Sequence, residues 1–101
     1  MDNCTVLVGT ICRAPEHSES PAGIPHTVLA LEHRSNQMEA GLNRQAYVRI
    51  QVVLTGTELT QHTKALTLGN MVKVTGFLNR HQSRSGQAKL VLHAQQIEQI
   101  S

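Results

Sequence analysis

The residues best suited to contact a ligand lie in a stretch of alternating polar and apolar side chains, 45–54. Its even positions are all apolar, whereas the only tyrosine of the chain, Tyr47, and the nearby Arg49 occupy odd positions. That period of two is typical of a strand with one buried and one solvated face. An aromatic ring beside a cation on a solvated face can stack on a nucleic-acid base or on a protein partner. The alternative is a half-covered ring shielded by neighbouring side chains or by a subunit interface.

The chain carries no pattern that indicates catalysis or a bound cofactor. Six histidines are present, but none stands in an HExxH motif, and the single aspartate, Asp2, is near the terminus. A phosphate-binding glycine loop is absent. Cys4 and Cys12 lack the spacing of zinc ligands and are too far apart along one strand to form a disulfide. We therefore expect no enzyme activity, no metal and no cofactor, and two buried free thiols in a reducing cytoplasm.

Length, composition and net charge limit the kinds of protein that this chain can be. With 101 residues we expect one domain, 1–101, and its core must be aliphatic because there is one phenylalanine and no tryptophan. No apolar run is long enough to cross a membrane, and the beginning of the chain does not read as a signal peptide. The net charge of +2 does not by itself indicate nucleic acid. The positions of the basic residues are therefore more informative than their number.

Apolar periodicity and turn residues predict five strands. Gly9 in the first is expected to mark a bend or a close approach to another backbone, and 35–44 reads as a mobile hairpin loop. A short helix or irregular linker is expected within 57–68, with Thr57 as a possible N-cap. The predicted strands are 3–13, 24–34, 45–54, 71–81 and 88–100.

Five strands with at most a short helix between the third and fourth predict an all-β fold, the five-stranded OB-fold barrel. Closure into a barrel removes exposed strand edges. The OB fold binds its ligands on strands two and three and on the flanking loops. Tyr47, the basic side chains Arg34, Arg44 and Arg49, and the hairpin 82–89 fall on or beside that face. Single-stranded nucleic acid fits such a face because cations contact phosphates while a ring stacks on bases.

Five segments of the chain resemble the primosomal replication proteins of the single-stranded DNA-binding (SSB) group of OB folds. The resemblance covers nearly the whole chain, and it favours the primosomal branch over full SSB proteins, which append a long acidic-ended tail. It implies a non-catalytic homodimer that binds single-stranded DNA and helps to reload the replisome at stalled forks, with PriA helicase and DnaT as partners. The matching segments are NCTVLVGTICRAP, PAGIPHTVLALEHRS, EAGLNRQAYVRI, GNMVKVTGFL and KLVLHAQQIEQI.

The same resemblance implies a set of DNA contacts. Relatives often have tryptophan where this chain has Tyr47, phenylalanine where it has Leu42, and lysines where it has Ser18 and Gln82. These differences predict binding of the same kind that is weaker or more salt-sensitive. A module that docks helicase or another protein, with incidental DNA contact, is the competing hypothesis. With Arg49 and Leu42 included, the expected site consists of Tyr47, Arg34, Arg44, Arg84, Lys89, Arg49 and Leu42.

Overall fold

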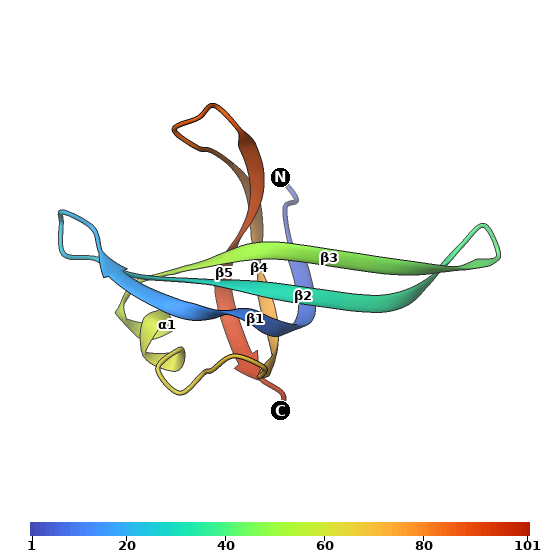
Figure 1. Ribbon diagram of the computed structural model, residues 1–101, viewed down its shortest axis with the longest axis horizontal. Coiled ribbons are helices and arrows are strands. Elements are labelled where there is room, and N and C mark those ends of the chain that lie inside the picture. Colours follow the sequence, from blue (N-terminus) through green and yellow to red (C-terminus); the bar gives the residue numbers. More distant parts are fainter.

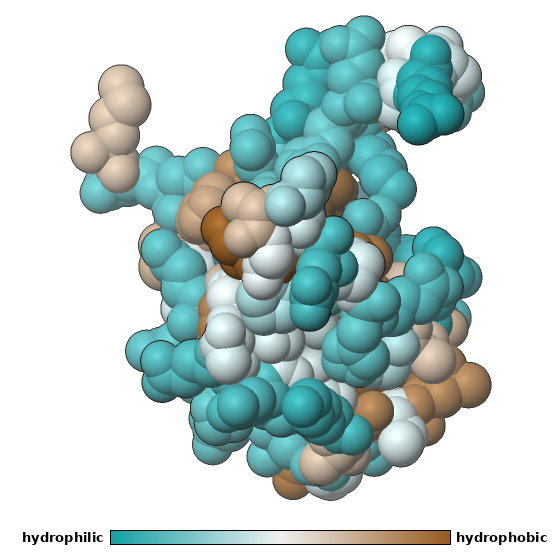
Figure 2. Space-filling view, turned by 90° about the vertical axis from the view of Figure 1, so that its left-hand side faces the viewer, coloured by the Kyte–Doolittle hydropathy of each residue, from teal (hydrophilic) through white to brown (hydrophobic).

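The computed structural model describes residues 1–101 and contains five strands and one helix. The β2–β3 hairpin extends to one side of the molecule and the β4–β5 hairpin extends in another direction (Figure 1). Hydrophilic side chains cover most of the β4–β5 hairpin and much of the face that includes α1 (Figure 2). The elements are β1 (Thr5–Glu19), β2 (Pro25–Glu39), β3 (Leu42–Thr55), α1 (Thr57–His62), β4 (Met71–Gln82) and β5 (Ala88–Gln99).

The strands form a closed barrel in the order β1-β2-β3-β5-β4. All neighbours are antiparallel except β3 and β5, which pair in parallel over 51–53 and 91–93. The single helix follows β3 and precedes β4. The all-β, five-stranded OB-fold barrel predicted from the sequence is therefore confirmed.

The barrel is filled by aliphatic side chains from all five strands. Alternate positions on each strand point inward, which is why the apolar alternation of 45–54 and 71–78 predicted the buried faces correctly. Leu66, which follows α1, joins this core. Removing such side chains from water is the main favourable contribution to folding. The most deeply buried apolar residues are Ile11, Leu29, Leu31, Val52, Leu54, Val72, Val74, Val91 and Leu92.

Two glycines allow strands to approach closely. A Cβ on Gly9 would lie 2.8 Å from the carbonyl oxygen of Glu32, and one on Gly76 would lie 1.9 Å from that of His93. Gly76 also adjoins the irregularity in the β4–β5 register. The close approach expected at Gly9 is thus confirmed, whereas the irregularities in the β1–β2 register come later, beginning between Ile11 and Arg13.

The strands are longer than the sequence predicted. β1 continues through Glu19, across residues expected to form a loop, because its second half pairs with β2 after its first half has paired with β4. The expected mobile loop 35–44 is instead a regular ribbon in which β2 and β3 pair up to Glu39 and Leu42. Ala40 and Gly41, both with positive φ (52° and 76°), close this ribbon in two residues. Polar composition suggested a loop here, but backbone pairing does not require apolar side chains.

Two local expectations were wrong, and the outer face of β1 is more exposed than its apolar composition suggests. Helix α1 begins after Gly56, which makes no side-chain cap, so Thr57 is not the N-cap. Cys4 is exposed and Cys12 half-buried, whereas buried thiols were expected. Val6 and Val8 are 54% and 37% exposed, so the outer face of β1 is open in the isolated chain. The physical reason is the same for Cys4 and the valines, because the inward positions near the beginning of β1 are odd-numbered.

Candidate nucleic-acid interface

Tyr47 stands on the outer face of the barrel with 54% of its surface exposed. Its partner across the β2–β3 ladder is Arg34. Side chains directly opposite each other on antiparallel strands share a face, and the guanidinium carbon of Arg34 lies 4.6 Å from the centroid of the tyrosine ring. The alternation within 45–54 predicted this outward placement. The guanidinium of Arg34 and the ring of Tyr47 thus contact each other on the outer face of the sheet.

A carboxylate that the sequence analysis did not select joins this pair. Glu32 accepts a hydrogen bond from Nε of Arg34 at 3.2 Å and from the Tyr47 hydroxyl at 3.4 Å. It lies two residues before Arg34 on the same face of β2, a spacing that could have identified it in advance. The carboxylate offsets part of the charge of Arg34 and holds both side chains against the sheet.

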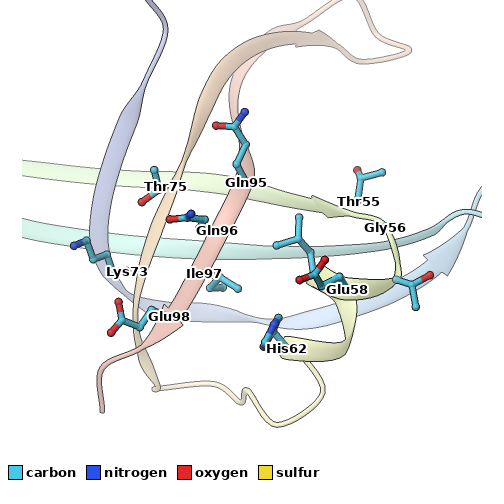
Figure 3. A pocket seen from close by; sticks show the side chains of 12 residues that line it. Thr55, Gly56, Glu58, His62, Lys73, Thr75, Gln95, Gln96, Ile97 and Glu98 are labelled. Atoms are coloured by element: carbon cyan, nitrogen blue, oxygen red, sulfur yellow. The ribbon is translucent and has the colours of Figure 1, made fainter.

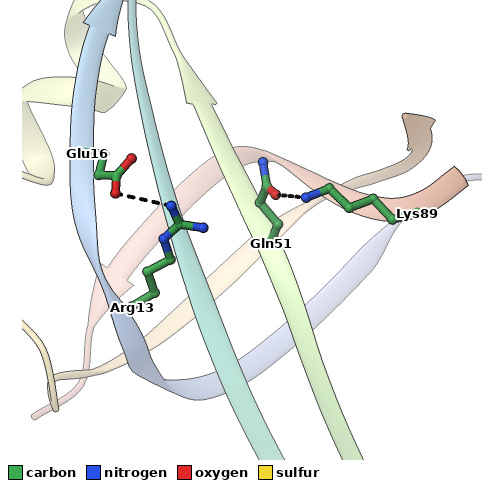
Figure 4. A network of polar contacts seen from close by, with 4 residues as sticks. All are labelled: Arg13, Glu16, Gln51 and Lys89. Carbon is green, nitrogen blue, oxygen red and sulfur yellow. Dashed lines mark hydrogen bonds and ion pairs between the residues drawn. The ribbon is translucent and has the colours of Figure 1, made fainter. Parts of the chain in front are cut away.

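Further along β3, two more of the predicted site residues, Arg49 and Lys89, adjoin the same outer face. Arg49 and Gln51 follow Tyr47 at alternate positions, about 7 Å apart along the strand. Nζ of Lys89 donates a hydrogen bond to Oε1 of Gln51 (Figure 4). This contact depends on the parallel pairing of β3 with β5, which places Gln51 opposite Val91. Tyr47, Arg34, Arg49 and Lys89 thus lie on the outer side of three neighbouring strands, with Glu32 opposite Arg49, and this surface is called here the β3 face.

Leu42 and Arg44 lie beyond the barrel, at the end of the β2–β3 ribbon. Both occupy even positions of β3, opposite in parity to Tyr47, and therefore lie on the other face of that strand. Nε of Arg44 is 3.6 Å from Oε1 of Glu39, and Leu42 is 60% exposed. The structure does not bring these two residues onto the β3 face.

Arg84 is exposed in the turn that joins β4 and β5. That hairpin extends away from the barrel in a different direction from the β2–β3 ribbon (Figure 1). Arg84 and Arg44 are thus located on two separate arms, and neither side chain lies on the β3 face.

One titratable group, His93, has a clearly shifted pKa, and it lies away from the β3 face at the base of the β4–β5 hairpin. Nε2 atoms of His81 and His93 are 2.8 Å apart, and the His93 ring stacks on Phe77 with centroids 5.0 Å apart. Burial, and secondarily the neighbouring His81, lower the pKa of His93.

The structure contains no group of three or more histidine, cysteine or acidic side chains that could hold a metal ion. It also has no helix long and apolar enough to span a membrane.

Comparison with known proteins agrees with this architecture. Residues 3–96 match a family described as another single-strand binding protein family. The chain is 52% identical over 98 residues to the replication restart protein PriB of Photorhabdus laumondii, an alignment that covers 97% of this chain and 93% of the relative. The chain therefore belongs to the single-strand binding protein family, on its PriB branch, as the resemblance of the sequence indicated.

Solved structures share the fold over the whole length of the chain. PriB from Ralstonia solanacearum superposes with a TM-score of 0.82 at 25% sequence identity, covering 100% of both chains. The single-stranded DNA binding protein of Thermus aquaticus superposes with a TM-score of 0.81 at 22% identity, covering 99% of this chain and 50% of the other. At that level of identity the second comparison supports the OB fold alone.

Proposed function

We propose that this protein is a non-catalytic, single OB-fold domain that binds single-stranded DNA during replication restart. The observation that carries the proposal is the β3 face, where the exposed ring of Tyr47 lies under Arg34 and close in sequence to Arg49. Stacking on a base contributes about 1–3 kcal/mol and is tolerant of sequence. Cations beside the ring contact the phosphates that connect successive bases. The relatives are named replication restart proteins, which supports replication restart as the process in which this chain acts.

The site has an inner and an outer part in this proposal. The inner part is the β3 face, with Lys89 at one end. The outer part consists of Leu42 and Arg44 on the β2–β3 ribbon and of Arg84 on the β4–β5 arm. Because the arms diverge, the outer residues contact only the parts of a bound DNA strand that extend beyond the barrel. Their contribution to DNA affinity is therefore smaller.

We extend the proposal to assembly and partners in the cytoplasm. The exposed apolar residues Val6 and Val8 on β1 fit a homodimer, because a second copy would cover them. Bridging of PriA helicase and DnaT at stalled forks follows from the resemblance to primosomal replication proteins. In that role the protein stimulates its partners and has no chemical step of its own.

A titration of fluorescein-labelled oligo-dT with the full chain at several salt concentrations tests the DNA-binding function. We expect saturable binding whose logarithmic affinity falls linearly with the logarithm of salt, by about 0.7 for each phosphate neutralised. A complete lack of binding at low salt would contradict the proposal.

A protein-interaction module is the second candidate, and the mixed charge around Tyr47 favours it. Tyrosine and arginine are enriched at the energetic centres of protein interfaces, and Glu32 provides an acceptor that DNA does not need. Tyr47→Ala separates the two functions. Loss of oligo-dT affinity supports DNA binding. Unchanged DNA affinity with weaker binding to PriA supports the interaction module.

A further inference from the structure

Two histidine rings meet at the base of the β4–β5 hairpin. His81 on β4 and His93 on β5 have their Nε2 atoms 2.8 Å apart, and their ring centroids are 5.0 Å apart. At this distance one Nε2 carries a hydrogen and donates it to the other. If the donor ring changes to its other tautomer, with the hydrogen on Nδ1, both Nε2 lone pairs become free without a change in net charge. Two neutral imidazole nitrogens, the commonest metal ligands in proteins, are then available side by side.

Strand pairing and ring stacking hold this pair in place. His93 is directly opposite Phe77, and the two rings are stacked with 5.0 Å between centroids and 4° between planes. His81 lies four residues beyond Phe77 on β4 and therefore on the same face of the sheet. Both histidines are half-buried, so water still reaches the pair. Because the rings are already positioned, a ligand that binds between them costs little side-chain entropy.

The distance between the two nitrogens favours one coordination geometry. Two metal–nitrogen bonds of about 2.0–2.1 Å place the nitrogens about 2.9 Å apart at a right angle and about 3.3 Å apart at a tetrahedral angle. The observed 2.8 Å is closer to the first value. Right-angled nitrogen ligands are typical of Cu²⁺ and Ni²⁺, whereas structural zinc sites are tetrahedral. A small rotation about χ2, a soft torsion in histidine, directs both lone pairs at one ion.

The charges around the pair permit a cation. Lys89 is opposite His81 on β5, and its charge there would oppose a metal ion. Its ammonium group, however, donates a hydrogen bond to Gln51 on β3 and is thus directed away from β4 (Figure 4). Neither histidine forms an ion pair with a carboxylate, so no acidic side chain competes with a metal for the rings.

From these observations we infer that His81 and His93 form a binding site for a divalent transition metal of the Ni²⁺ or Cu²⁺ type, with water in the remaining coordination positions. The sequence analysis expected no metal because it searched for ligand spacings along the chain. These two ligands are twelve residues apart and meet only through the pairing of β4 with β5. A bound ion would link the two strands at the base of the arm that carries Arg84.

The first test adds Ni²⁺ to the unaltered protein and observes two rings by NMR. Phe77 is the only phenylalanine and Tyr47 the only tyrosine, so the signals of each ring are unambiguous. Tyr47 lies six residues along β3 from Val53, which is opposite His93, a distance of about 20 Å. Substoichiometric Ni²⁺, which is paramagnetic, should shift or broaden the Phe77 signals and leave those of Tyr47 unchanged. Addition of EDTA should reverse the effect.

The second test assigns the ligands by calorimetric titration with Ni²⁺. His81→Gln and His93→Gln should each weaken binding by at least about tenfold, because removing a group that only orients a metal ligand already costs about 10–100-fold. His62→Gln is the matched control and should leave the affinity unchanged. It removes an exposed histidine from the groove between α1 and β5, which Glu58 and Glu98 also line and which is the competing site for a cation (Figure 3).

Several results would overturn the inference. They are a lack of Ni²⁺ binding by the unaltered protein, an equal response of the Phe77 and Tyr47 rings, and a loss of affinity in His62→Gln as large as in His93→Gln. Cys4→Ser removes an exposed thiol that could also bind Ni²⁺, and loss of binding in this variant would assign the ion to the thiol. The NMR test needs no variant, so it decides the matter even if a histidine substitution impairs folding.

Discussion

The guanidinium of Arg34 covers the ring of Tyr47, with 4.6 Å between its central carbon and the ring centroid, and Glu32 accepts hydrogen bonds from both side chains. The three residues form one small network on the outer face of the barrel. In this arrangement Arg34 is already oriented beside the ring on which a base would stack. The carboxylate, however, competes with the phosphate that the cation would otherwise contact.

Glu32→Gln should therefore increase the affinity for oligo-dT. Exposed ion pairs contribute about 0.2–1 kcal/mol, so the expected rise is up to about fivefold at low salt and smaller at high salt. The matched control is Glu98→Gln on β5, which makes the same change in net charge away from the β3 face. Equal affinities of the two variants would show that Glu32 does not restrain Arg34.

Substitutions that keep a ring at position 47 test stacking separately from hydrogen bonding. Tyr47→Phe retains the ring and loses only the long hydrogen bond to Glu32, so oligo-dT affinity should stay within about twofold. Tyr47→Trp offers a larger aromatic surface and should bind more tightly. Quenching of the introduced tryptophan's fluorescence by DNA provides a direct measurement. A loss with Phe as large as the loss with Ala would argue against stacking.

Gly76→Ala should destabilise the barrel severely. The added Cβ would lie 1.9 Å from a backbone oxygen of β5, which cannot move without separating β4 from β5. Overpacking of this kind costs about 1–3 kcal/mol and occasionally more, and we expect the upper end. Gly9→Ala, with a contact at 2.8 Å, should cost less. Urea unfolding measures both variants, and equal midpoints for Gly76→Ala and the unaltered protein would contradict the register at this position.

The His81–His93 pair predicts a specific dependence of stability on pH. Because the pKa of His93 is lower in the folded chain than its usual 6.5, the unfolded chain binds a proton first as the pH falls. The contribution of His93 to stability is thus fully present above pH 6.5 and is lost as the pH decreases from there towards its folded pKa. His93→Gln should make the urea midpoint less sensitive to pH in this window, whereas His62→Gln, at an exposed position, should not. A pH dependence unaltered by His93→Gln would refute the assignment.

Much of the barrel and part of the site could be read from the sequence. The alternation within 45–54 fixes which side chains of that strand face the core, and hence that Tyr47 and Arg49 face outward. Side-chain alternation is a local property of an extended chain, so it needs no knowledge of the partner strand. The same property explains why Val72 and Val74, at alternate positions of β4, are both buried in the core. At 35–44 the polar composition led to the wrong prediction of a mobile loop, because the ribbon there is held by backbone pairing with few apolar contacts.

The tertiary structure alone decided which remote residues meet. Glu32 beside Tyr47, Lys89 beside Gln51 and Arg13 across from Ala30 all depend on strand register and on closure of the barrel. Register is set by the packing of the whole core and by close approaches such as that at Gly76, and a shift of one residue would turn every side chain to the other face. One strand's periodicity fixes its faces, whereas the neighbours of each face depend on non-local pairing.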